Sequence, residues 1–344
     1  MLPLRLRLDT DALQANWRAL DRMSGAAACG AAVKANGYGL GALDVVERLA
    51  AAGCRDFFVA TWAEAVALAP LGQSVSVLHG VRDEDMADAR AGVARPVLST
   101  RAQVARWRAA GGGRCDVMVD TGMNRLGVAV ADVAAGLLDG LSIDTLMSHL
   151  ACADEEGAAA AAMSERQRAA FTALAGRTGA ARMSLANSAG IALGQDYAFD
   201  LTRPGLALYG GVPRREFAGI VRQVAFPEAQ VLQRRTVPAG ESVGYNATWI
   251  APAATEVAIV NIGYADGYPR ALSGRGGARV GDVGLPVIGR VSMDLVALDV
   301  SAAPALAEGA WVTMDFDVAA IAERSGLSQY ELLTGLAARY RRGG

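Results

Sequence analysis

The chain has 344 residues, of which 52% are hydrophobic, and carries 33 basic and 35 acidic side chains for a formal net charge of −2. A chain of this length can bury a sizeable core, either as two domains or as one large domain with an addition. The balanced charge, with no basic block and no cluster of arginines among aromatic residues, argues against nucleic acid as a partner.

Cysteine and histidine usage argues against disulfides and metal sites. The four cysteines show no Cys-x-x-Cys spacing, which indicates reduced thiols in a cytoplasmic protein: Cys29, Cys54, Cys115 and Cys152. The only histidines, His79 and His149, are too few for a three-histidine metal site. Because the longest apolar stretches are interrupted well short of a membrane span, we expect no membrane association.

The first two thirds of the chain alternates apolar runs with helical patterns. Residues 4–8 alternate Leu and Arg, as in a strand, and Thr10 or Asp11 can cap a helix that extends to about Met23. Eight apolar runs of strand length follow: 29–34, 56–60, 74–79, 94–98, 115–120, 144–149, 182–186 and 201–208. Helical patterns lie between them, for example at 41–52, 100–110 and 163–178. This alternation predicts an α/β fold with a parallel (β/α)8 barrel of the TIM type.

From about Gly219 the pattern changes. Val, Thr, Gly and Pro become frequent, which predicts a mostly-β domain with strands at 257–262, 285–290, 295–300 and 311–316, closed by helices at 318–325 and 329–340. We therefore expect residues 1–9 to form a strand that joins the β domain, 10–218 to form the barrel, and 219–344 to form the C-terminal β domain with two terminal helices.

Lys34 is the only lysine in the chain. A guanidinium stays protonated and is a poor nucleophile, whereas a desolvated lysine can lose its proton and form a Schiff base with a carbonyl group. Lys34 ends the first apolar run and precedes a Gly-rich turn that carries Tyr38. This placement indicates a reactive amine, and a leftover surface lysine in an arginine-rich chain is the alternative.

Further polar residues follow other strands of the predicted barrel, where the active site of such a barrel forms. They are Arg125, His149, the Asn-Ser-Ala-Gly stretch 187–190 and the Arg-Pro-Gly stretch 203–205. Each alone is explained as well by a solvated charge, a core histidine or a turn. Together with Lys34, they lie at five strand ends of one barrel, which predicts a shared site.

These stretches resemble the alanine racemases, a family of fold-type III enzymes that use pyridoxal 5′-phosphate (PLP). The resemblance follows family order over almost the whole chain, through residues 33–39, 120–127, 148–149, 186–189, 203–205, 243–245, 263–268 and 289–294. It implies a cytoplasmic homodimer that interconverts the small amino acids L- and D-alanine and so supplies D-alanine for peptidoglycan.

The resemblance also implies two catalytic bases. Lys34 would hold PLP through a Schiff base and act as one base, while Tyr245, from the partner's β domain, would act on the opposite face of the substrate Cα. A tyrosine has a reference pKa of about 10, so Tyr245 needs a neighbour that lowers its pKa or shares its proton. His149 is the implied candidate.

The resemblance places the remaining residues around the cofactor and substrate. The phosphate would be held by Tyr38, Ser188 and backbone N–H groups near Ser188 and Gly205. Arg203 would face the pyridine nitrogen, where a cation weakens the ring as an electron sink and limits side reactions. Arg125 would pair with the cofactor's phenolic oxygen or the substrate carboxylate. The other implied residues are His149, Asn187 and Leu206 at the cofactor, Met293 at the substrate, and Asp154, Tyr264, Arg270 and Arg290 at the substrate entrance.

Four positions depart from the family pattern. Met118 replaces a lysine that is carbamylated in many members and braces the arginine matching Arg125, and Ser184 replaces a histidine that supports the arginine matching Arg203. Ser292 replaces a frequent cysteine. Ala338 stands where some members have a pocket-narrowing tyrosine, which predicts that serine or larger amino acids compete with alanine.

Several other functions remain open at this level. The nearest is a broader amino-acid racemase of the same fold, for example one acting on serine. A PLP-dependent decarboxylase would need an acidic partner where Arg203 stands and a cysteine beyond Cys152, which the sequence lacks. A PLP carrier without catalysis would not need a β domain with Tyr245, and a PLP-free aldolase would not need the 187–190 loop.

Overall fold

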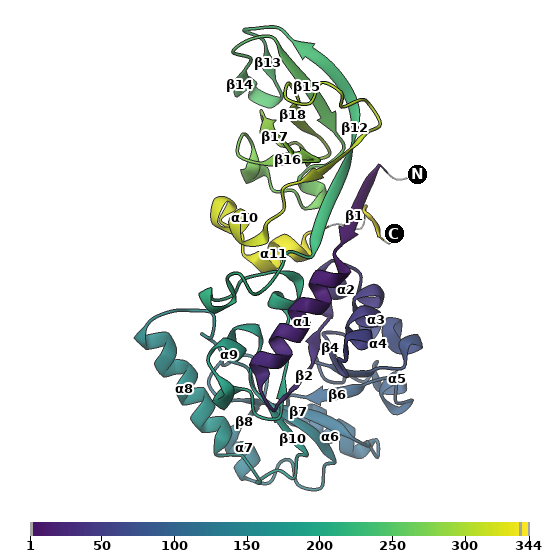
Figure 1. The fold of residues 1–344 in the computed structure, drawn as a ribbon. Coiled ribbons are helices and arrows are strands. Elements are labelled where there is room, and N and C mark those ends of the chain that lie inside the picture. The colour runs from purple at the N-terminus through teal and green to yellow at the C-terminus, as the bar shows by residue number, and fades with distance from the viewer. Residues whose placement is uncertain (1–2, 337–338, 343–344) are drawn as a thin grey trace. The chain divides into compact units, whose positions relative to one another are not determined.

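The computed structural model describes residues 3–336 and 339–342, so Ala338 lies outside the described residues. The chain forms two compact units (Figure 1). The barrel unit comprises Asp11–Gly37 and Ala42–Arg222, and the β unit comprises Met1–Thr10, Tyr38–Gly41 and Gln223–Gly344.

Parallel strands of the barrel unit form a closed ring. Seven neighbours follow in chain order: β3 (Ala31–Ala32), β4 (Asp56–Val59), β5 (Ser74–Val77), β6 (Arg95–Leu98), β7 (Cys115–Asp120), β9 (Ile143–Met147) and β10 (Arg182–Ser184). The next strand, β11 (Leu201–Thr202), pairs with β2 (Ala28–Cys29), which only Gly30 separates from β3. Backbone N–H groups of Asp200 and Arg203 donate to Met183 and Ala186 and join β11 to β10. The expected (β/α)8 barrel is therefore confirmed.

Helices connect these strands. They are α1 (Thr10–Ser24), α2 (Lys34–Tyr38), α3 (Ala42–Ala52), α4 (Trp62–Leu68), α5 (Met86–Arg90), α6 (Arg101–Ala109), α7 (Val130–Ala134), α8 (Ala158–Thr172) and α9 (Ser188–Ala192), with 3-10 turns η1 (Ala69–Leu71), η2 (Gln195–Tyr197), η3 (Leu206–Tyr209) and η4 (Arg215–Phe217), and a short strand β8 (Val128–Ala129) beside β7. The expected helix 163–178 is α8, which starts five residues earlier because the alanines before Met163 are strong helix formers.

The β unit is built on one long strand. β1 (Leu4–Leu8) pairs antiparallel with β12 (Ala225–Val237). The apolar pattern did not predict β12, because the second half of this strand is polar. The other strands are β13 (Ser242–Val243), β14 (Trp249–Ile250), β15 (Thr255–Val260), β16 (Gly277–Val280), β17 (Val283–Ile288), β18 (Val296–Asp299), β19 (Trp311–Met314) and β20 (Arg341–Arg342). The 3-10 turns of this unit are η5 (Tyr245–Ala247), η6 (Tyr264–Asp266) and η7 (Arg270–Leu272). Helices α10 (Val318–Ser325) and α11 (Gln329–Thr334) follow, and α11 is shorter than the expected 329–340.

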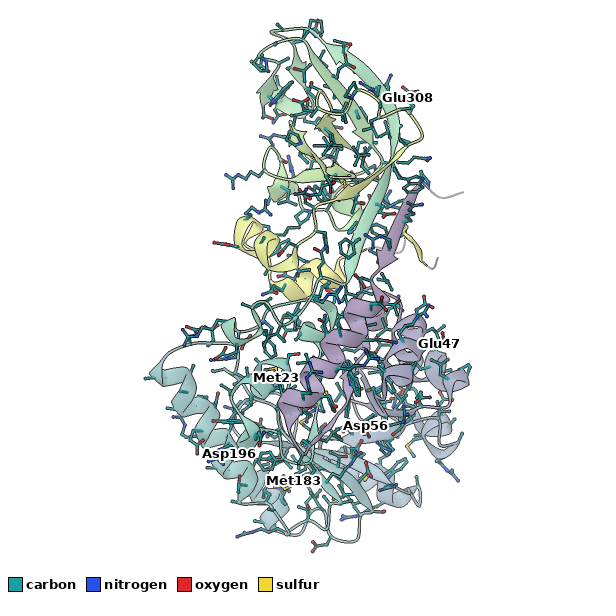
Figure 2. All side chains as sticks on the ribbon, in the orientation of Figure 1. Met23, Glu47, Asp56, Met183, Asp196 and Glu308 are labelled. Atoms are coloured by element: carbon teal, nitrogen blue, oxygen red, sulfur yellow. The ribbon has the colours of Figure 1, made fainter. Side chains whose placement is uncertain are left out.

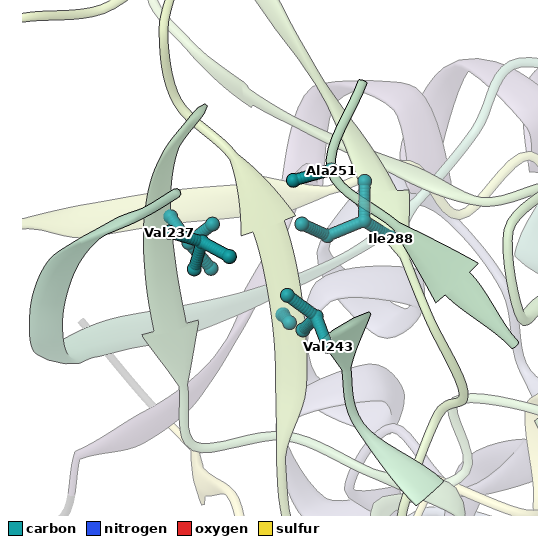
Figure 3. Close-up of a cluster of buried hydrophobic side chains, with 6 residues drawn as sticks. Val237, Val243, Ala251 and Ile288 are labelled. Carbon is teal, nitrogen blue, oxygen red and sulfur yellow. The ribbon is translucent and has the colours of Figure 1, made fainter. Parts of the chain in front are cut away.

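Each unit has its own apolar core. In the barrel, Phe58, Val97, Met147 and Leu201 pack together from four strands, with Met118 against them. In the β unit, the buried side chains of Val237, Val243, Ala251 and Ile288 form a cluster with Val257 and Ala297 (Figure 3). Within the described part of the chain, no helix has the length and apolar character needed to cross a bilayer.

Candidate active site

Lys34 lies two residues after β3, beyond the C-terminal end of that barrel strand. The preceding N–H, of Val33, donates to Phe58 O at 2.8 Å, so the strand pairing reaches almost to the lysine. Burial lowers the pKa of Lys34, the positive charges of Arg125 and Arg203 lower this pKa further, and Glu64 opposes them. These surroundings make the Lys34 ammonium easier to deprotonate than that of an exposed lysine, so the nucleophilic amine forms more readily.

A left-handed turn follows Lys34 and makes up the rest of the segment labelled α2. Ala35, Asn36, Gly37 and Tyr38 all have φ between 53° and 63°. A left-handed conformation costs a non-glycine residue roughly 1–2 kcal/mol, and such strain concentrates at functional sites. The turn is held partly by Asn36 Oδ1, which accepts a 2.9 Å hydrogen bond from Ala42 N.

Glu64 provides the other support of this turn. Its Oε1 accepts from Ala35 N at 2.5 Å and from Asn36 N at 3.3 Å. Its Oε2 accepts from Ala60 N at 2.8 Å and from Thr61 N at 3.1 Å, completing the capping box of α4. Glu64 is not among the residues expected at the site from the sequence, although Thr61-x-x-Glu64 is a recognisable capping pattern.

Arg203 follows β11 and is buried, with 7% of its surface exposed. Its guanidinium donates to Ser184 Oγ through Nη1 and to Ser148 O through Nη2, the second bond at 2.6 Å. Burial lowers the pKa of Arg203 to about 10, so the group remains a cation at neutral pH. Ser184 thus supports Arg203 directly.

His149 follows β9 and faces the same charges. Burial, together with the positive charges of Arg203, Arg125 and Lys34, lowers the pKa of His149 to about 3. The imidazole is therefore neutral at physiological pH. Arg125 is exposed in the loop after β7, and no hydrogen bond or ion pair within residues 3–336 and 339–342 braces it, while Met118 packs into the barrel core.

Two further loops of the barrel unit meet at Ser188. Its Oγ accepts from Gly205 N at 2.9 Å and from Ala207 N at 3.2 Å. Asn187 caps α9 by accepting from Gly190 N at 2.9 Å, and the buried Leu206 begins η3. The loops after β10 and β11 are thereby joined.

The expected residues of the β unit lie on adjoining loops. Tyr264 N donates to Ser292 O at 3.0 Å, and Ala265 N donates to Met293 O at 3.1 Å. A Cβ added at Gly244 would lie 3.4 Å from Arg290 N, which places Tyr245 beside the same loops. Tyr245 and Met293 are 69% and 53% exposed.

Three expected residues stand apart from these sets. Arg270 is exposed at the start of η7, and Asp154 is exposed in the loop after β9. Tyr38 is buried in the β unit, where its ring centroid lies 6.2 Å from that of Tyr330, and burial raises its pKa.

The charges of the barrel site suit an anionic ligand that carries a carbonyl group. Lys34, Arg125 and Arg203 all lower the pKa of His149, and Glu64 is the carboxylate that acts on Lys34. Such an excess of positive charge favours phosphate and carboxylate, and a desolvated amine reacts with an aldehyde. The residues present therefore fit PLP. Among the described residues, no group of three His, Cys, Asp or Glu side chains could hold a metal ion.

Fold and site together define a class of barrel protein in which a desolvated lysine lies among cations that suit an anionic cofactor. Comparison with known proteins narrows this class. The patterns described as "Alanine racemase, N-terminal domain" and "Alanine racemase, C-terminal domain" match residues 8–213 and 224–343. The alanine racemase of Acidiphilium cryptum (strain JF-5) is 43% identical in an alignment that covers 98% of this chain and 97% of that relative.

Solved structures agree. The biosynthetic alanine racemase from Pseudomonas aeruginosa is 33% identical, with a TM-score of 0.86 over 100% of this chain and 99% of that one. The alanine racemase from Bartonella henselae, solved with covalently bound pyridoxal phosphate, is 32% identical, with a TM-score of 0.85 over 99% of both chains. The chain belongs to the alanine racemase family.

Proposed function

We propose that this protein racemises alanine with PLP, using Lys34 of one subunit and Tyr245 of a second copy as bases on opposite faces of the substrate Cα. Family membership supports both the reaction and the cofactor. The observation that carries the proposal is the desolvated Lys34 at the end of β3, surrounded by Arg125, Arg203 and His149.

The barrel supplies the groups that bind the cofactor. Lys34 would attach it, while Ser188 and the backbone at Gly205 and Leu206 would hold its phosphate. Arg203, fixed by two hydrogen bonds, would keep a permanent positive charge at the pyridine nitrogen. When bound, PLP withdraws electrons from the substrate Cα and makes its C–H bond acidic.

Two bases follow from the stereochemistry. A single base would return the proton to the face from which it came, whereas inversion needs removal on one face and delivery on the other. Lys34 exchanges a proton with Cα on one face, and Tyr245 does so on the other. His149, neutral at physiological pH, can accept a hydrogen bond from the Tyr245 hydroxyl, and Arg125 would pair with the substrate carboxylate.

Exposure in the β unit supports a homodimer. Tyr245, Met293 and Tyr264 are 69%, 53% and 44% exposed on adjoining loops, and an apolar surface of this kind is typical of an interface. A second copy that covers these loops would bring Tyr245 to its own barrel site.

Mixing two inactive variants tests this arrangement. If each site takes Lys34 from one copy and Tyr245 from the other, refolding Lys34→Ala with Tyr245→Phe restores one intact site in each mixed dimer, or about a quarter of wild-type activity. Sites contained within one chain would recover no activity, which would contradict the shared site.

Solvent isotope exchange tests the chemistry. Alanine added in heavy water should gain one deuterium at Cα as it racemises, and neither single variant should racemise it. Borohydride reduction followed by peptide mass mapping should find the cofactor on Lys34, the only lysine. Serine run in parallel measures substrate breadth. Failure to bind PLP or to exchange the Cα proton would refute the proposal.

The proposed role in the cell is the supply of D-alanine for peptidoglycan in the cytoplasm. Expression of the protein should remove the D-alanine requirement of a bacterium that lacks its own alanine racemase. The Lys34→Ala variant is the control, and growth with that variant would argue against this role.

A further inference from the structure

We infer that Glu64 is a positioning residue for Lys34: its carboxylate fastens the left-handed turn behind the lysine and places a negative charge in an otherwise positive site. This inference rests on the proposed role of Lys34 as the amine that holds the cofactor and moves the proton. Glu64 lies in α4, the helix that follows the neighbouring strand β4 in the chain.

The geometry shows one carboxylate joining two loops. Oε1 accepts from Ala35 N at 2.5 Å and Asn36 N at 3.3 Å, the two residues directly after Lys34. Oε2 accepts from Ala60 N at 2.8 Å and Thr61 N at 3.1 Å, after the adjacent strand β4. Since β3 and β4 are paired in parallel, Glu64 ties the ends of two neighbouring strands together. The left-handed turn would otherwise relax toward ordinary backbone angles and move the lysine with it.

The charge of Glu64 opposes that of its neighbours. Arg125 and Arg203 act on Lys34 as cations, and His149 lies in the same field as a neutral group. Glu64 is the negative charge that offsets them. A group that must both take up and return a proton works best when its pKa lies near the working pH. Glu64 therefore keeps the amine from becoming too weak a base.

A test follows from the single lysine. Reductive methylation of cofactor-free protein with 13C-formaldehyde labels only Lys34 and the N-terminus, so NMR titration reports the pKa of Lys34 without any racemase activity. In Glu64→Gln, we expect this pKa to fall by about 1, the size of effect that a lost opposite charge has nearby. In the loaded enzyme, the acidic limb of kcat against pH, which reports the complex in which the substrate has freed the Lys34 amine, should move the same way.

Two further variants separate three roles of Glu64: its charge, its hydrogen bonds to Ala35 and Asn36, and its part in capping α4. Thr61→Ala removes the hydroxyl that caps α4 but leaves Glu64 on Ala35 and Asn36, so the pKa of Lys34 should stay at its wild-type value. Glu64→Asp keeps the charge but shortens the reach, so the pKa should stay near the wild-type value while the amide protons of Ala35 and Asn36 exchange faster.

An unchanged pKa of Lys34 in Glu64→Gln, or a fall of the same size in Thr61→Ala, would overturn the inference. Because wild-type PLP binding and alanine exchange are measured separately, either result would leave the proposed function standing.

Discussion

The two ends of the barrel differ in their charge balance. At the C-terminal ends of the strands, Lys34, Arg125 and Arg203 are close enough to lower the pKa of His149, and Glu64 is the carboxylate that acts on Lys34. The positive charge there is left in excess. A site of this kind is electrostatically unfavourable until an anion occupies it.

At the N-terminal ends, positive and negative charges are matched. Arg182 lies 2.8 Å from Asp56, which is labelled in Figure 2, and 2.7 Å from Asp144. Arg95 lies 3.4 Å from Asp116 and 3.5 Å from Asp144. Burial opposes ionisation of Asp144, but the Arg182 hydrogen bond and the charge of Arg95 outweigh it and hold its pKa below the usual value.

The contrast separates binding from stability. Satisfied ion pairs at one end hold the strand starts together, whereas the unbalanced cations at the other end are available to a ligand. Substitutions at the two ends should therefore change different measured quantities.

The largest expected effect is that of Lys34→Arg. Arginine keeps the positive charge but cannot lose its proton or attach the cofactor, so kcat should fall at least about 1,000-fold, or roughly 4 kcal/mol in the barrier. The urea unfolding midpoint should change little, because the Lys34 side chain of the wild-type protein belongs to no ion pair within the described residues. Activity within tenfold of wild type would remove Lys34 from the mechanism.

Asp116→Asn should show the opposite pattern. Asp116 is fully buried and accepts hydrogen bonds from Ser76 at 2.6 Å and Thr145 N at 3.0 Å, as well as the Arg95 contact. Breaking such a network should lower the free energy of unfolding by about 3 kcal/mol. Urea denaturation measures this loss, and kcat should change far less than in Lys34→Arg.

Arg114→Ala provides the matched control at that end. Arg114 pairs with Asp144 at 2.5 Å, but its side chain is 60% exposed. Its removal should cost no more than about 0.5 kcal/mol. Equal losses in Asp116→Asn and Arg114→Ala would mean that burial does not set the strength of the network.

His149 predicts a pH dependence of the cofactor-free protein. Its pKa is about 3 when folded, against about 6.5 when unfolded, so only the unfolded chain takes up this proton as the pH falls below 6.5. The unfolding free energy should therefore decrease from pH 6.5 downward, by about 2 kcal/mol at pH 4.5. His149→Gln should remove this part of the slope, and parallel profiles for wild type and variant would contradict the assignment.

Ser184→Ala should have a small effect on both stability and kcat. Arg203 would lose one acceptor and keep Ser148 O, at a cost of about 1 kcal/mol in stability, with a lower kcat because the guanidinium is less firmly held. Ser76→Ala, at the other end of the barrel, is the matched control and should cost similar stability with no change in kcat. A kcat loss of equal size in both variants would mean that Ser184 has no special role.

Patterns in the sequence were sufficient where the physics is local. Apolar runs mark buried parallel strands, because strands covered on both faces cannot alternate polar and apolar residues. Each of the eight expected runs overlaps a barrel strand. β12 was not predicted, because its second half, with Gln233, Arg234 and Arg235, is polar and half-exposed. The predicted bounds of the helix around Met163 differ from those of α8, because periodicity locates a helix more reliably than it locates the ends of that helix.

The sequence by itself determined the barrel, the following β unit and the exceptional status of Lys34, since strand periodicity and residue counts need no knowledge of distant neighbours. Only the tertiary structure decided what surrounds that lysine. Glu64 reaches the turn from 28 residues away, and Ser148 meets Arg203 across 55 residues. The low pKa of His149 exists only once burial and three cations converge on it. Charge balance depends on distance in space, and the fold alone sets those distances.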